Sequence, residues 1–349
     1  MIPNLMVFII ALIGGLIFTP LAKWLSFKTG ILDRPGFRKI HDHPIPRMGG
    51  EAILLSIGLA LLFYFPNHRE LWSIIIFGLL FVCFGLIDDA DIKIRARNKI
   101  LSHLIFSFLF IYFSGITLTF FPVNWINWLI TACFITFMTN SMNMLDGMDG
   151  LVAGISCLSA GFFAVLAWNS GQQDLLMLSV AVIGGTIGFL RYNFNPASIF
   201  LGEAGSTLLG FLMALLAIKL NIFTLWNVAL SLGIERLQII TFIVPLIVLG
   251  IPIFDTYFVF SNRFLHRIKF SQPGKDHSHH RIHLMGFSQK ATVLTLYAVQ
   301  IVLGSISLAM IRADLQQFFS LLLIVAVFFV SFTMLLLRVK VYEHHDSTA

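Results

Sequence analysis

Asn143, Asp146 and Asp149 recur at every third position of the stretch NSMNMLDGMDGLVAG, which lies between two long apolar segments. In a helix this spacing would keep the three side chains within about 120° of arc, so that their oxygens could converge on one cation or polar ligand. The glycines that follow the two aspartates would let a ligand approach the backbone. A polar loop with helix-capping Asn and Asp is the competing interpretation, and this stretch alone does not decide between the two.

A second group of carboxylates, Asp88, Asp89 and Asp91, closes another apolar segment in LIDDADIKIRARNK. Adjacent carboxylates repel each other, and this repulsion costs energy unless a cation is present. A divalent metal ion is the natural compensator. The competing interpretation is a solvated helix end.

Glu203 lies between Gly202 and Ala204, just before an apolar segment, in RYNFNPASIFLGEAGSTLLGF. The small neighbours bring the backbone close to a ligand, and the carboxylate supplies a hard oxygen. Mg²⁺ prefers one or two carboxylates plus substrate phosphates to a closed protein cage. The alternative is a glutamate that is favoured at this place only by the helix dipole.

Five histidines stand among Arg and Lys in the loop NRFLHRIKFSQPGKDHSHHRIHLMGFSQK, and His277, His279 and His280 form an HxHH pattern. Without a nearby cysteine, this spacing favours donors for a pyrophosphate over a closed tetrahedral metal site. A transition-metal site and an inert basic loop remain as alternatives.

The loop GILDRPGFRKIHDHPIPRMGGEA is also basic, with Arg38, Lys39 and His41 at its centre. Its positive charge and its proline turns suit a phosphate. Gly49 and Gly50 begin the next apolar segment, where free backbone N–H groups can face an anion. The charges alone are equally well explained by a cytoplasmic membrane loop.

The composition places these clusters in a membrane protein. Of 349 residues, 58% are hydrophobic and only 11% are charged, whereas charged residues make up about a quarter of a soluble domain. Unbroken apolar runs exclude an outer-membrane barrel, and the first one, which lacks a basic start, predicts a membrane helix rather than a cleavable signal. Cys83, Cys133 and Cys157 fall in apolar segments without close spacing, so we expect neither a disulfide framework nor a thiolate site.

We predict an all-α integral membrane protein, a polytopic bundle of about eleven transmembrane helices. The apolar segments lie at about 4–24, 50–65, 71–87, 99–115, 124–141, 151–168, 174–190, 204–220, 238–259, 290–310 and 317–337. With the N-terminus outside and the C-terminus cytoplasmic, all but four of the 23 Lys and Arg fall on the cytoplasmic side. The positive-inside rule therefore favours this orientation, and it places the carboxylate and histidine clusters at the cytoplasmic face.

The whole chain, residues 1–349, is predicted to form one integral domain, because its two longest polar loops are too small to bury a core of their own. The net charge of +6 is explained by topology and anionic lipid, so we expect no nucleic acid among the partners.

In combination, the motifs DRPGFRKIHDHPIPRMGG, LIDDADIK, NMLDGMDGL, FLGEAGS and KDHSHHRIHLMG resemble those of the polyprenyl-phosphate N-acetylhexosamine-1-phosphate transferases. The resemblance runs from about Asp33 to Gln289. Within this family the chain is more similar to the branch that uses UDP-N-acetylglucosamine or a related UDP-HexNAc than to the branch that handles UDP-MurNAc-pentapeptide.

The resemblance implies a reaction at the cytoplasmic face of the cell membrane. A HexNAc-1-phosphate moves from a UDP-sugar to undecaprenyl phosphate, which releases UMP and initiates a lipid-linked cell-envelope glycan. It implies Mg²⁺ as the cofactor, with Mn²⁺ as a second candidate, to offset the charge of the two phosphates. The identity of the HexNAc and the oligomeric state, including a homodimer, are left open.

By resemblance, the catalytic pair that activates the lipid phosphate is Asp88 and Asp89, and the metal-site candidates are Asn143 and Glu203. The residues implied to contact the nucleotide sugar are Asn140, Asp146, Asp149 and Phe200. Those implied to bind the pyrophosphate are His277, His279, His280 and Arg281. Glu203 is a departure, because this branch of the family usually has Asp there.

A polytopic transporter is the alternative from another functional class, since carboxylates within a membrane also mark ion pathways. A transporter would place charged residues near mid-membrane in both halves of the chain. Here nearly all of them are predicted to lie at one face, and no internal repeat is present. The sequence therefore favours the transferase.

Overall fold

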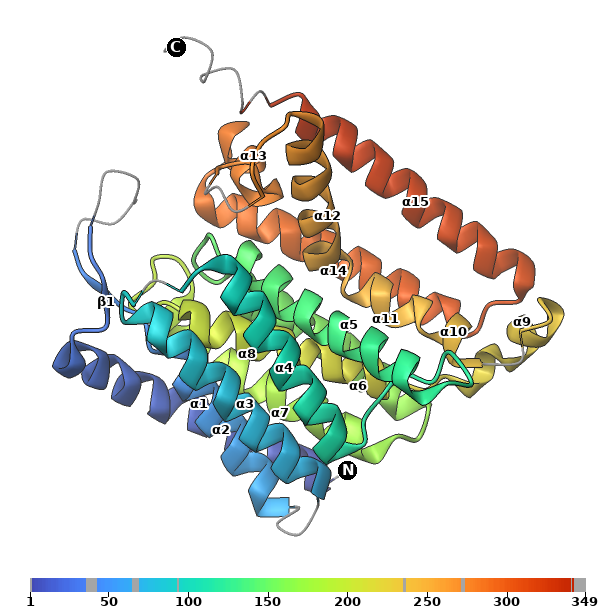
Figure 1. Ribbon diagram of the computed structural model, residues 1–349, viewed down its shortest axis with the longest axis horizontal. Coiled ribbons are helices and arrows are strands. Elements are labelled where there is room, and N and C mark those ends of the chain that lie inside the picture. Colours follow the sequence, from blue (N-terminus) through green and yellow to red (C-terminus); the bar gives the residue numbers. More distant parts are fainter. Residues whose placement is uncertain are drawn as a thin grey trace.

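The computed structural model of the protein describes residues 2–35, 43–64, 69–92, 94–234, 237–270, 274–339 and 341. These residues form a bundle of helices with one short two-stranded ribbon (Figure 1). Arg38, Lys39 and His41 of the basic first loop lie outside the described residues, as does the C-terminal tail beyond residue 341.

The first half of the chain builds the larger part of the bundle. Its elements are α1 (Ile2–Thr29), β1 (Leu32–Asp33), β2 (Ile45–Pro46), α2 (Gly49–Tyr64), α3 (Arg69–Asp89), α4 (Ala96–Ser114), α5 (Asn124–Leu145), α6 (Leu151–Asn169) and α7 (Gln173–Asn193). The strands pair antiparallel, with Leu32 opposite Pro46 and Asp33 opposite Ile45. This ribbon joins α1 to α2 at one end of the bundle.

The second half contains the central helix and a group of shorter, bent elements. They are α8 (Gly202–Lys219), the 3₁₀ turn η1 (Phe223–Leu225), α9 (Trp226–Ser231), α10 (Leu237–Thr241), α11 (Ile243–Val248), α12 (Gly250–Leu265), α13 (Ser278–Leu284), α14 (Gln289–Met310) and α15 (Leu315–Leu337). In Figure 1, α12 to α15 stand beside the bundle of α1 to α8.

The structure is that of an all-α, multi-pass membrane protein, as the sequence predicts. Within the described residues, seven helices are long and apolar enough to cross a membrane, or eight if the pair Gln238–Val248 and Gly250–Leu265 counts as one span. The expected count of about eleven is not confirmed. α2 is too short for this criterion. Polar residues at the start of α4 and at the end of α5 lower the hydropathy of both helices. The span expected at 238–259 is bent by 83°.

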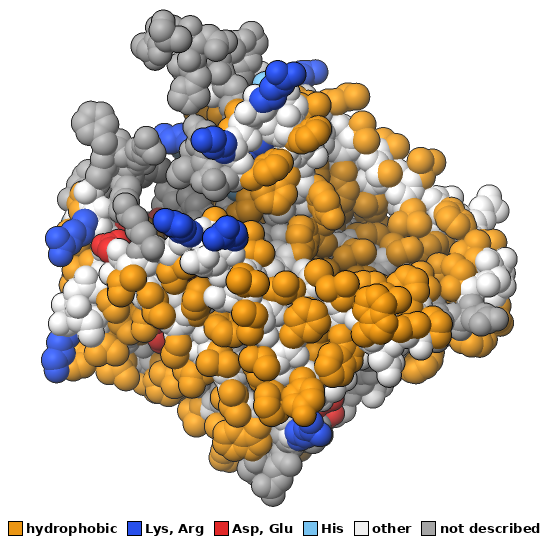
Figure 2. Space-filling model, in the orientation of Figure 1, with side chains coloured by type: hydrophobic (Ala, Val, Ile, Leu, Met, Phe, Trp, Pro, Cys, Tyr) orange, Lys and Arg blue, Asp and Glu red, His pale blue; other side chains and the backbone are white. Residues whose placement is uncertain are grey.

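The outer surface fits a lipid environment. On the face shown in Figure 2, hydrophobic side chains cover most of the helices, and Lys and Arg side chains lie near their ends. α15 exposes apolar side chains along its length, among them Leu323 and Val327. Such exposure would be unusual in a soluble protein and is expected in contact with acyl chains.

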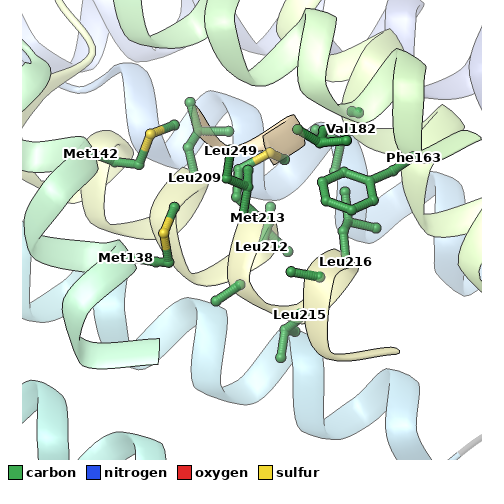
Figure 3. Close-up of a cluster of buried hydrophobic side chains, with 14 of the residues drawn as sticks. Met138, Met142, Phe163, Val182, Leu209, Leu212, Met213, Leu215, Leu216 and Leu249 are labelled. Carbon is green, nitrogen blue, oxygen red and sulfur yellow. The ribbon is translucent and has the colours of Figure 1, made fainter. Parts of the chain in front are cut away.

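α8 forms the centre of the bundle, because every residue from Ala204 to Ile218 is buried. Its sequence is apolar on all sides, as expected for a helix that other helices surround. Met138 of α5, Phe163 of α6 and Val182 of α7 pack around its leucines (Figure 3). The position of α8 is therefore set by packing against several neighbours, and its N-terminal residues are held in place at the end of the bundle.

Polar side chains gather at the two ends of the bundle. At one end, Gln173 at the start of α7 donates to Asn4 near the start of α1, and Lys219 at the end of α8 pairs with Glu70 at the start of α3. The opposite end brings together the last residues of α3, α5 and α7 and the first residues of α6 and α8. The last turn of α15 is tied to α13, so the two ends of the described chain lie at opposite ends of the bundle.

Candidate active site

A cavity of about 330 Å³ opens at this second end of the bundle. Its walls come from the ends of α3, α5 and α7, the start of α8 and the ribbon next to α1. The residues predicted from sequence that line it are Asp88, Asp89, Asn143, Asp146, Asp149, Phe200 and Glu203. Asp33 and Arg47 of the first loop also line it, so four motifs that are far apart in the sequence meet in one cavity.

Asp88 and Glu203 are joined by a lysine that the sequence did not single out. The ammonium of Lys99, on α4, lies 2.9 Å from Oδ2 of Asp88 and 2.5 Å from Oε2 of Glu203. The three side chains come from α3, α4 and α8. In the sequence Lys99 is one of several cations after the aspartate motif, and only the fold distinguishes it from Arg95 and Arg97.

Asp89 is engaged differently from its neighbour. Its carboxylate is only 6% exposed and accepts hydrogen bonds from the backbone N–H groups of Glu203 and Ala204, each at 3.0 Å. Gly202, just before them, has φ of 74°, and a Cβ there would press on the backbone of Arg47 and on the Asp89 carboxylate. Asp89 therefore caps the start of α8 and fixes the position of Glu203.

The motif NMLDGMDGL does not lie on one helix. α5 ends at Leu145, so Asn143 is helical while Asp146 and Asp149 lie in the following turn. Asp149 accepts from the side-chain amide of Asn195 and from the N–H of Ala197, both at 3.0 Å. The side chains still converge, because the turn folds back over the end of the helix.

The lining of the cavity is strongly acidic. Six carboxylates and one guanidinium, that of Arg47, line it among the described residues; the carboxylates are Asp33, Asp88, Asp89, Asp146, Asp149 and Glu203. Burial, and then the charges of Asp89 and Asp149, raise the pKa of Asp146 to about 8. Arg47 is itself paired with Asp33. The raised pKa favours the neutral form of Asp146 at neutral pH, and the carboxylates that stay ionised would repel an anionic substrate unless a further cation came with it.

The donor set fits an incomplete Mg²⁺ site. In the described part of the chain, no group of three or more His, Cys, Asp or Glu is arranged to hold a metal ion. Oε1 of Glu203 is buried and has no hydrogen-bond partner among the described residues, while Oδ1 of Asn143 accepts from the Ser206 hydroxyl at 2.9 Å. Mg²⁺ commonly takes one or two carboxylates and completes its octahedron with water and substrate phosphates, so these residues suit a site that the substrate would complete.

Asn140 does not line the cavity. Its side-chain amide donates to the carbonyl of Thr136 at 2.7 Å and lies 3.2 Å from Nδ1 of His103, a buried residue of α4. Asn140 is nearly one helical turn before Asn143 on α5, so it lies deeper in the bundle, below the floor of the cavity that Asn143 lines.

The histidines lie next to the cavity rather than in its lining. A Cβ added to Gly147, which lines the cavity, would overlap Nε2 of His279. The rings of His279 and His280 are 4.2 Å apart, and those of His277 and His279 are stacked at 5.5 Å. Burial, and then the neighbouring histidine charges, lower the pKa of His280 to about 4 and that of His279 well below its usual value.

Arg281 is 2% exposed, and its guanidinium forms hydrogen bonds within the protein. It donates to the backbone carbonyls of Asp276, Leu336 and Val339 and lies 5.1 Å from the ring centre of Phe258. These contacts attach α13 to the end of α15. The structure thus brings Arg281 beside the histidines but turns its charge toward backbone carbonyl groups.

Known proteins with similar sequences are transferases. The family model described as glycosyl transferase family 4 matches residues 71–221. A probable undecaprenyl-phosphate N-acetylglucosaminyl 1-phosphate transferase of Bacillus subtilis (strain 168) is 32% identical over 310 residues, which cover 86% of this chain and 82% of that protein. A phospho-N-acetylmuramoyl-pentapeptide-transferase of Anoxybacillus flavithermus is 28% identical over 319 residues, which cover 84% of this chain and 91% of that protein.

Proposed function

Because this chain belongs to glycosyl transferase family 4, we propose that it transfers N-acetylglucosamine 1-phosphate from UDP-N-acetylglucosamine to undecaprenyl phosphate. The bond between the two phosphates of the UDP-sugar breaks, an oxygen of the lipid phosphate bonds to the sugar phosphate, and UMP leaves. The geometric observation that supports this proposal is the convergence of Asp88, Asn143 and Glu203, from three helices, in one cavity. The transporter alternative is not favoured, since the similar proteins are transferases.

The acidic lining supports Mg²⁺ as the cofactor, held by Glu203 and Asn143, with Mn²⁺ as the second candidate. When bound, the ion would neutralise the pyrophosphate and draw the two phosphate substrates together. The ammonium of Lys99 offsets the charges of Asp88 and Glu203 and keeps both carboxylates at the cavity wall.

The remaining residues are assigned by where they lie. Asp88 faces the cavity and would accept a proton from the lipid phosphate, while Asp89 positions the start of α8. Asp146, Asp149 and Phe200 would contact the nucleotide sugar. Asn140 would support them from below the cavity floor.

The histidines would contact the pyrophosphate from the side of Gly147. Four residues were predicted for this role; we propose it for His277, His279 and His280, while Arg281 would fix the helix that carries them.

We place the site at the cytoplasmic face of the cell membrane. The distribution of Lys and Arg between the predicted loops supports this side. A homodimer remains a prediction.

The proposal is tested by UMP release from purified protein with undecaprenyl phosphate, Mg²⁺ and a panel of UDP-sugars. We expect UDP-N-acetylglucosamine to be turned over at least tenfold faster than UDP-MurNAc-pentapeptide, and EDTA to abolish release. If UMP is released only with UDP-MurNAc-pentapeptide, the chain belongs to the other branch of the family. If EDTA does not affect release, the proposed metal cofactor is wrong.

Substitutions of Glu203 test the metal site. Glu203→Gln keeps the length of the side chain but gives up its charge, so it should raise the Mg²⁺ concentration for half-maximal UMP release about tenfold and lower the maximal rate. Glu203→Asp should retain activity, because a hard carboxylate oxygen remains. Asp91→Asn is the matched control, since this exposed carboxylate should leave the Mg²⁺ curve unchanged. An unchanged curve in Glu203→Gln would exclude Glu203 as a ligand.

A further inference from the structure

Asp255 is a fully buried carboxylate that neither the motifs nor the cavity explain. It lies on α12, in an apolar stretch, and is 0% exposed. A carboxylate in such a place is costly unless hydrogen bonds satisfy both of its oxygens. Here Oδ1 accepts from the N–H of Ser278 and Oδ2 lies against Nδ1 of His277, each at 2.7 Å.

These two contacts determine the state of the His277 ring. An ionised carboxylate only accepts hydrogen bonds, so Nδ1 of His277 must carry a proton toward Asp255. Nε2, on the far side of the ring, is then left for another partner. The backbone contact to Ser278 fixes the residue that follows, so the ring cannot turn freely at the start of α13.

A second contact from α12 holds the same segment. Arg263 donates to both oxygens of Asp276, at 2.6 and 2.7 Å, and to the carbonyl of Phe270 at 2.7 Å. Arg263 follows Asp255 by eight positions, which places them on one face of α12. This face therefore holds residues 276–278 through one carboxylate and one guanidinium, and α13 lies beside α12 in Figure 1.

The charges around His277 favour its protonated form. Burial alone would lower the pKa of His277, but the charge of Asp255 and its hydrogen bond outweigh burial and raise it. The other charged or titratable groups that act on this ring or lie beside it are Asp276, Arg263, His279 and His280, and Lys275 acts on the neighbouring His280. The pKa values of His279 and His280 are shifted the opposite way, so of the three rings His277 is the one whose protonated form is favoured.

We propose that Asp255 is a positioning residue for the transfer reaction, which holds His277 as a fixed donor to the pyrophosphate of the nucleotide sugar. The proposal rests on the function proposed above. His277 stacks on His279, and His279 contacts the turn that carries Asp146 and Asp149, so a shift of His277 would be passed on to the cavity. A charge-assisted donor is lost if either member of the pair is changed.

The test compares Asp255→Asn, His277→Gln and the double variant in detergent-purified protein, with UMP release and UDP binding by calorimetry as readouts. Each single change should raise the KM for the UDP-sugar and the Kd for UDP about tenfold, with a smaller effect on kcat. In the double variant the two effects should not add, because both changes remove one interaction. The loss in Asp255→Asn should be larger at pH 8 than at pH 6, since the asparagine no longer favours protonation of His277.

Thr256→Val is the matched control, because it alters the next buried polar residue of α12, whose hydroxyl donates to the carbonyl of Pro252 in the same helix. It should leave KM and Kd unchanged. If Asp255→Asn does not fold, His277→Gln decides alone, and a wild-type KM in that variant would overturn the proposal. Additive effects in the double variant would do the same. Failure of the wild-type protein to release UMP would instead reject the proposed function.

Discussion

Replacing Lys99 by methionine should lower the rate of UMP release by about 10²–10³-fold, the range seen when one charge-stabilising donor is lost from an active site. The ammonium lies between Asp88 and Glu203, within 2.9 and 2.5 Å. Without it, two carboxylates face each other in a cavity already rich in negative charge, and their repulsion would move both. Lys99→Arg should recover only part of the activity, because the planar guanidinium cannot occupy the same point between the two carboxylates.

Arg97→Met is the control for this prediction. Arg97 belongs to the same basic run as Lys99 but is exposed. Its replacement should leave the rate within about twofold of wild type, as is usual for exposed side chains that contact nothing essential. Equal losses of activity in the two variants would show that only the net charge of the basic run matters. Wild-type activity in Lys99→Met would show that Lys99 has no role in the reaction.

Asp88→Asn and Asp89→Asn should separate activity from stability. Both changes should lower the rate by at least about 100-fold. Asp89→Asn should also lower the free energy of unfolding by about 1–3 kcal/mol, because its amide would turn a donor toward one of two backbone N–H groups that need acceptors. Asp88→Asn should leave stability close to wild type, since Asp88 lies at the cavity wall.

Denaturant titration in detergent, run beside the UMP assay, measures both quantities. Equal stability in the two variants would contradict the capping role of Asp89. Full activity in Asp88→Asn would remove it from the chemistry.

Much of the site could be predicted because chemistry-bearing residues stand at the ends of apolar segments. Asp88, Asn143 and Glu203 each lie where a long helix begins or ends, and the alternating direction of the helices brings those ends to one side. The central position of α8 could be inferred in part, since its sequence is apolar on every face.

What could not be predicted depends on the direction of individual side chains. Consecutive residues of a helix point about 100° apart, so Asp88 faces the cavity while Asp89 faces the start of α8. The same rotation separates Arg281 from His280. No sequence pattern indicated a role for Asp255, because its hydrogen-bond partners lie more than 20 residues away in sequence. The 83° bend between Val248 and Gly250 could not be recognised, because it lies within one continuous apolar run.

The acidic cavity also has a consequence for the design of inhibitors. A pyrophosphate mimic would meet six carboxylates and a single guanidinium among the described lining residues, so its affinity would depend on the divalent cation that accompanies it. A compound that carries its own ammonium or guanidinium group could instead occupy the place of the cation and contact Glu203 directly. Such compounds would compete with Mg²⁺ and would keep their affinity in a chelating buffer, whereas pyrophosphate mimics would lose theirs.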